Sequence, residues 1–258
     1  MALKLNNYPE DLIEYNFSRS IKLMEKFYPE FKKNKHEERL NHRIVTASSI
    51  FGYLYYQKEQ SADSRKYFKI AAEALSNEFY YVPAPTEGHQ TRNPWAFIEA
   101  INIISSFGNN EDIARLCDVE ESKYHNYPEE QNKKDCQFLA DYVSAAKSYL
   151  STGTVDTSSL SNLVDAANLG KRTKEEQHFV VPVVKGLNAL VKNDQSNWQA
   201  AVQESLDAHL KEVKTGEYRK NYRGFICMPG MMLLKLGQDK GWNADIDSLY
   251  LPLTLLEA

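Results

Sequence analysis

Two apolar stripes at helical spacing, separated by a short polar turn, constrain the fold of this chain more than any other feature. They lie in residues 186–214, on either side of the turn 192–195. The second stripe recurs every three or four residues, the spacing that places side chains on one face of an α-helix. Its members are Trp198, Val202, Leu206, His209 and Val213. We therefore predict a helical hairpin whose second helix begins at Ser196, because Ser196 and Gln199 have the spacing of a capping box.

A single helical hairpin cannot bury its apolar faces alone and needs neighbours of the same kind. Comparable stripes run through most of the chain, in 12–27, 40–55, 67–75, 95–107, 138–150, 160–167 and 229–236. No stretch alternates apolar and polar residues as strands with hairpin turns do, and glycine (11) and proline (9) are scarce. The sequence therefore predicts an all-α fold of about ten helices in antiparallel hairpins, either TPR-like or a closed helical bundle.

We expect one helical domain over residues 1–258, a length that suits one large domain or two closely packed ones. A sub-division could lie near 80–94, where Pro83, Pro85 and Pro94 interrupt the helical pattern. A loop of this kind is either functional or an extended strap packed across the helices by its aromatic residues. The sequence leaves both interpretations open.

Composition excludes several classes of protein. Hydrophobic residues make up 42% and charged residues 26%, the balance of an ordinary globular protein. A net charge of −4 argues against a basic nucleic-acid binder. No apolar run is long enough for a signal peptide at the start or for a membrane span later, so we expect a soluble cytoplasmic protein. The three cysteines are expected to be free, buried thiols.

No motif predicts a catalytic residue, a metal or a cofactor. Glu175 and His178 match the Glu-x-x-His spacing of helical di-iron sites, but such a site needs a second motif and two more carboxylates. None of the other five histidines has a glutamate three residues before it. A helical enzyme acting on a small molecule remains the alternative, resting on this motif and on the proline-rich loop around His89.

One stretch, residues 111–130, concentrates negative charge. It holds seven carboxylates against two cations, Arg115 and Lys123. The carboxylates are Glu111, Asp112, Asp118, Glu120, Glu121, Glu129 and Glu130. Blocks of like charge often form only a solvated face, but clustered carboxylates also steer a cationic protein toward its binding site. We interpret these seven residues as a candidate docking surface for a basic protein partner.

The C-terminal part of the chain carries a family resemblance. An apolar helix runs into Gly237-Gln238-Asp239-Lys240-Gly241-Trp242, and the segment Asp247-Ser248-Leu249-Tyr250-Leu251-Pro252 follows. This ending resembles the close of the immunity protein 49 family of bacterial polymorphic toxin systems, and the turn 194–198 is also similar. The resemblance is best in the C-terminal third.

The resemblance implies a cytoplasmic protein without catalytic activity that binds and neutralises one cognate toxin, encoded beside it. We expect a toxin delivered by type VI secretion, and the acidic stretch favours a nuclease, since carboxylates can occupy the positions of nucleic-acid phosphates. A third possibility is a peptide-binding helical-repeat scaffold, whose concave groove would be lined by some of the 16 tyrosines. The sequence gives no oligomeric state.

Overall fold

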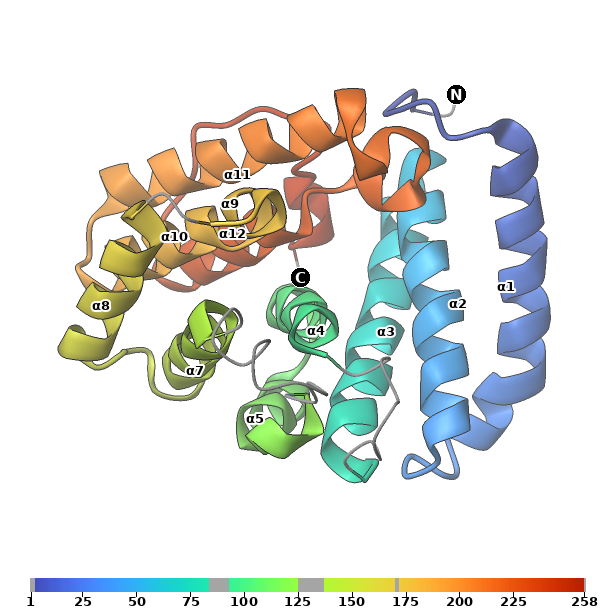
Figure 1. The fold of residues 1–258 in the computed structure, drawn as a ribbon. Coiled ribbons are helices and arrows are strands. Elements are labelled where there is room, and N and C mark those ends of the chain that lie inside the picture. The colour runs from blue at the N-terminus through green and yellow to red at the C-terminus, as the bar shows by residue number, and fades with distance from the viewer. Residues whose placement is uncertain (1–2, 84–92, 125–136, 170–171, 258) are drawn as a thin grey trace.

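The computed structural model describes residues 3–83, 93–124, 137–169 and 172–257. Helices make up most of these four ranges, and no β-strand occurs in them. Figure 1 shows the helices packed around one another, with the N-terminal helices at one end of the molecule. The prediction of an all-α fold is confirmed. The TPR-like arrangement and the division into domains stay predictions.

The α-helices follow the apolar stripes of the sequence. They are α1 (Glu10–Phe31), α2 (Glu38–Gln57), α3 (Ser61–Tyr81), α4 (Pro94–Phe107), α5 (Asn110–Asp118), α7 (Gln137–Thr152), α8 (Thr157–Asn168), α9 (Lys174–Phe179), α10 (Val181–Val191), α11 (Gln195–Thr215) and α12 (Met228–Asp239). Single 3-10 turns are η1 (Glu121–Lys123), η2 (Glu217–Lys220), η3 (Tyr222–Phe225) and η4 (Leu253–Leu255). No helix in these ranges combines the length and apolar composition that crossing a membrane would need.

The helix α4 lies at the centre of the molecule, surrounded by α3, α5, α7 and α12 (Figure 1). Asn93 caps its start by accepting a hydrogen bond from the amide of Ala96, and Pro94 occupies its first turn. Phe97, Ile101 and Ile104 are fully buried, so this helix forms much of the core.

The predicted hairpin is formed by α10 and α11, which pack on α12. Trp198 is completely buried, and its indole Nε1 donates a hydrogen bond to the main-chain oxygen of Leu233 (2.8 Å). The predicted start of α11 at Ser196 is wrong. Asp194 is the cap, because its carboxylate accepts from the amide of Asn197 (3.0 Å), and the helix begins one residue later at Gln195.

The helix α1 lies at the edge of the molecule, next to α2 (Figure 1). A small second core joins the two helices, with Met24 and Phe31 from α1 packed near Ile44 and Phe51 from α2. The apolar stripe predicted in 12–27 includes Leu12 and Ile21, but these two residues are 40% and 38% exposed. An edge helix buries only a narrow stripe, so apolar residues that flank this stripe remain in solvent.

Candidate functional site

The first half of the acidic stretch forms α5, which packs against α3 and α7. The outer side of α5 borders an open groove of about 670 Å³, which we call the acidic groove. Its lining includes Tyr80, Glu111, Ile113, Asp118, Leu150 and Ser151. Glu120 and Glu121 follow at the end of α5 and are exposed. The groove thus combines the carboxylates of Glu111 and Asp118 with apolar side chains such as Ile113 and Leu150, and Arg115, which pairs with Glu111, also lines it. Exposed carboxylates beside apolar contacts suit a cationic side chain of a protein partner.

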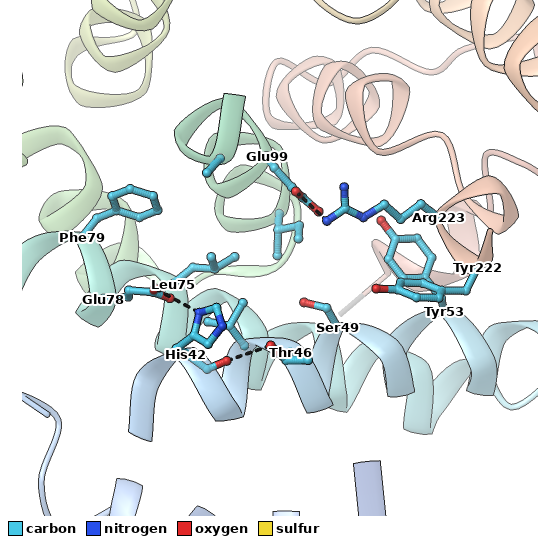
Figure 2. A pocket seen from close by; sticks show the side chains of 13 residues that line it. His42, Thr46, Ser49, Tyr53, Leu75, Glu78, Phe79, Glu99, Tyr222 and Arg223 are labelled. Atoms are coloured by element: carbon cyan, nitrogen blue, oxygen red, sulfur yellow. Dashed lines mark hydrogen bonds and ion pairs between the residues drawn. The ribbon is translucent and has the colours of Figure 1, made fainter. Parts of the chain in front are cut away.

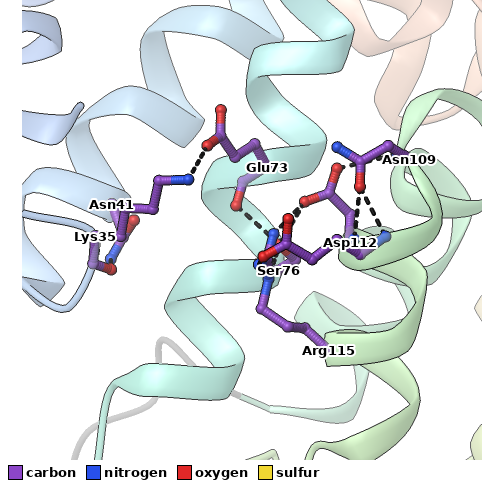
Figure 3. A network of polar contacts seen from close by, with 8 residues as sticks. Lys35, Asn41, Glu73, Ser76, Asn109, Asp112 and Arg115 are labelled. Atoms are coloured by element: carbon purple, nitrogen blue, oxygen red, sulfur yellow. Dashed lines mark hydrogen bonds and ion pairs between the residues drawn. The ribbon is translucent and has the colours of Figure 1, made fainter.

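Asp112, on the same helix, is buried and faces Ser76 of α3 (Figure 3). It is 2% exposed, and its Oδ2 accepts from the amide of Asn109 (3.0 Å), while the Asn109 side chain accepts from the amide of Asp112 (3.0 Å). These two hydrogen bonds form a capping box that satisfies amides at the start of α5. Asp112 is therefore held inside the fold and does not face a partner.

The other oxygen of Asp112 binds a buried cation. Its Oδ1 lies 2.6 Å from Nη2 of Arg115 and 3.0 Å from the hydroxyl of Ser76 on α3. Arg115 also donates from Nε to Ser76 (3.2 Å) and from Nη1 to the exposed Glu111. This network ties α5 to α3, as Figure 3 shows. Arg115, one of the two cations in the acidic stretch, thus pairs with residues of the protein itself.

Four of the seven predicted binding residues are exposed in the structure: Glu111, Asp118, Glu120 and Glu121. We call these four the acidic edge. Glu129 and Glu130 lie outside the described residues. The burial of Asp112 could have been inferred from the sequence, because Asn109 and Asp112 have the spacing of a capping box directly after Gly108, where α4 ends.

A second candidate site is a cleft of about 190 Å³ that the sequence did not reveal (Figure 2). Residues from α2, α3, α4 and η3 line it, among them His42, Tyr53, Glu78, Glu99, Tyr222 and Arg223. Figure 2 shows Glu99 and Arg223 facing each other across one end of the cleft and His42 beside Glu78 at the other. No local signal could predict this cleft, because its lining comes from four separate segments of the chain, of which η3 lies far from the other three in the sequence.

The charged groups of the cleft form pairs. Nη2 of Arg223 lies 3.1 Å from Oε2 of Glu99, and Nδ1 of His42 lies 3.5 Å from Oε1 of Glu78. The hydrogen bond to Glu78 raises the pKa of His42, and burial raises the pKa of Glu99 against the opposing effect of Arg223. The Thr46 hydroxyl donates to the main-chain oxygen of His42 (2.9 Å). The carboxylates and basic side chains of the cleft are therefore paired with one another.

His178, the histidine of the Glu-x-x-His match, has a structural role. Nδ1 of His178 lies 2.8 Å from Oε1 of Glu212, a residue of α11 that also pairs with Lys174 (2.7 Å). This contact joins α9 to α11. Within the described ranges, no three His, Cys, Asp or Glu side chains are grouped so that they could hold a metal ion. The loop around His89 lies outside those ranges.

Comparison with protein families identifies the chain. The model of a family described as immunity protein 49 matches residues 57–255, which is most of the chain. The chain belongs to the immunity protein 49 family. No curated protein and no solved structure matches it.

The match to the immunity protein 49 family extends well beyond the C-terminal third in which the sequence resemblance is best. It includes the acidic edge on α5 and η1, as well as the parts of the cleft that come from α3, α4 and η3. Membership points to a toxin-neutralising immunity role. The residues of α1, and all but the last residue of α2, precede the matched range.

Proposed function

We propose that this protein is a non-catalytic immunity protein that binds a cognate bacterial toxin through the acidic edge and so neutralises it. The observation that carries this proposal is the family match over residues 57–255. The acidic groove supports it, because exposed carboxylates around an apolar floor attract a cationic protein and give it a surface to pack on.

A nuclease is the toxin class that this chemistry favours. A nuclease binds the phosphates of its substrate with cationic side chains, and exposed carboxylates can pair with the same cations. Glu111, Asp118, Glu120 and Glu121 would then lie where phosphates lie in the substrate complex. The protein would act in the cytoplasm, beside the nucleic acid that such a toxin attacks, against a toxin delivered by type VI secretion.

The test is co-expression with the product of the adjacent reading frame, with recovery of a complex and rescue of growth as the two measurements. The decisive variant reverses the acidic edge with Glu111→Lys, Asp118→Lys, Glu120→Lys and Glu121→Lys. We expect it to fold, to associate with the toxin at least tenfold more slowly, and to lose protection, because steered association depends on complementary charge.

A matched control changes the net charge by the same amount elsewhere on the surface. It carries reversals at four other exposed carboxylates, namely Glu175→Lys, Asp207→Lys, Asp245→Lys and Asp247→Lys. This control should bind and protect as the wild type does. Unchanged affinity and protection in the acidic-edge variant would remove this surface from the proposal, and a wild-type protein that neither binds nor protects would contradict the immunity function.

A further inference from the structure

A second groove, of opposite charge, runs between α1 and the start of α2. It encloses about 570 Å³ and is lined on the α1 side by Arg19, Lys22 and Lys26 and on the α2 side by Arg39 and Arg43. We call it the basic groove. Figure 1 shows α1 at the opposite edge of the molecule from α7 and α8, so the groove lies at the N-terminal end of the helical array.

The five cations of the basic groove have no anionic partner in the described part of the chain. None of them takes part in an ion pair there, whereas Lys35, Lys174, Lys185 and Arg223 do. Four of the five are exposed, and Arg43 is half-buried. An ordinary helical surface alternates charges so that neighbours attract each other. Here the charges of both groove walls are available to a partner.

The spacing of these cations concentrates positive charge on one face of each of the two helices. Arg19, Lys22 and Lys26 are three and four residues apart on α1, and Arg39 and Arg43 are four apart on α2. Like charges at these spacings repel each other and disfavour the helix. Glu25 and Glu30 lie at these same spacings from Lys22 and Lys26 and offset part of this repulsion, and a bound anionic group would relieve the rest.

The groove also offers apolar contact. Tyr15 and Phe27 line it together with Leu23, and the Tyr15 side chain is 61% exposed. Binding sites for protein segments typically combine charged rims with exposed aromatic side chains, because the aromatic group supplies buried area at a low entropic cost.

We propose that the basic groove binds an acidic segment of the cognate toxin, a contact separate from the acidic edge. This inference rests on the proposed function, because it takes the toxin as the partner. Two surfaces of opposite charge fix the orientation of a partner and reject proteins that match only one of them.

The dimensions favour a protein segment over nucleic acid. The three cations of α1 span about 10 Å along the helix axis, from seven steps of about 1.5 Å between Arg19 and Lys26, which matches a short acidic segment. A long polyanion would extend past the groove and meet a chain whose net charge is −4.

The experiment uses the full-length protein and the purified, catalytically inactivated product of the adjacent reading frame. Association and dissociation rates are measured for the wild type, for the variant Arg19→Glu, Lys22→Glu, Lys26→Glu, and for a control with equal charge change, Lys192→Glu, Lys211→Glu, Lys214→Glu. The substituted residues are exposed in both variants, and circular dichroism verifies the fold. We expect at least a tenfold loss of affinity in the groove variant and less than a twofold change in the control.

Three results would overturn the inference, and each points to a different conclusion. Equal affinity of groove variant and control, with tight binding by the wild type, leaves the immunity function intact and removes the groove from the interface. A wild-type protein that forms no complex contradicts the proposed function itself, and with it this inference. A 12-base-pair DNA duplex that binds the wild type but not the groove variant assigns the groove to nucleic acid.

Discussion

The guanidinium of Arg115 lies 2.6 Å from the carboxylate of Asp112, and this pair is buried directly beneath the exposed Glu111. Neighbouring residues of one acidic stretch therefore have different roles. Asp112 holds α5 against α3 through Ser76, while Glu111 and Asp118 line the acidic groove. The stability of the fold and the recognition of a partner can thus be separated by mutation within a single turn of helix.

The first prediction concerns this buried pair. Asp112→Ala removes a capping box and leaves the charge of Arg115 buried without its partner. We expect it to lower the free energy of unfolding by about 3–5 kcal/mol, the usual cost of breaking a buried ion pair, as measured by urea denaturation. Glu120→Ala, an exposed carboxylate two residues beyond α5, should change it by less than about 0.5 kcal/mol. A similar small effect at Asp112 would contradict the structural role of the network.

A second prediction follows from the contact between α11 and α12. A Cβ added at Gly237 would lie 2.1 Å from Cζ2 of Trp198, so Gly237→Ala forces the indole out of its position. We expect overpacking to destabilise the fold by about 1–3 kcal/mol. The double variant with Trp198→Phe should lose less than the sum of the two single variants, because the smaller ring leaves room for the methyl group. Strict additivity in thermal unfolding would show that the two residues do not contact each other.

A third prediction concerns the dependence of stability on pH. Burial lowers the pKa of His209 from 6.5 to about 4, and its ring contacts Tyr218 and Tyr250, with Glu212 nearby. Its Nε2 lies 3.0 Å from the main-chain oxygen of Gly224. Because the unfolded chain then binds a proton that the folded chain excludes, stability falls as the pH drops from about 6.5 to about 4. The loss is about 3 kcal/mol.

His209→Gln keeps a donor for Gly224 and removes the titration. The difference in unfolding free energy between wild type and variant, measured from pH 7 to pH 4, isolates this contribution from that of the carboxylates. A difference between wild type and His209→Gln that stays constant with pH would show that His209 is not buried in its neutral form.

His42 titrates in another pH range. Its raised pKa stabilises the fold below about pH 6.5, and this contribution is lost as the pH rises through the folded pKa of His42.

A fourth prediction concerns salt. If the acidic edge steers the toxin, the association rate falls as ionic strength rises, because salt screens exposed charges. The association rate of the acidic-edge variant should depend much less on salt than that of the wild type. Stopped-flow measurements between about 0.05 and 0.5 M salt test this, because the Debye length shortens about threefold over this range. Equal salt dependence in both proteins would place the interacting charges elsewhere.

Local patterns in the sequence were sufficient to predict most of the helices. The apolar stripe of Trp198, Val202 and Leu206 is buried as expected, since a period of 3.6 residues is a local property of the chain. The caps at Asn93 and Thr173 also follow from local sequence, because in each the side chain and the amide that it binds are only three residues apart. The all-α class and the family resemblance follow from such local patterns.

Which charged side chains are exposed depends on how the helices pack, and local patterns do not show it. Glu111 and Asp112 are adjacent in the sequence, yet one faces solvent and the other pairs with Arg115 against Ser76 of α3. The cleft likewise brings together Glu99 and Arg223, which are far apart in the sequence, and the basic groove depends on how α1 and α2 pack side by side. Helical periodicity fixes the direction of a side chain relative to its own axis, but the position of the neighbouring helix determines whether that direction meets water or protein.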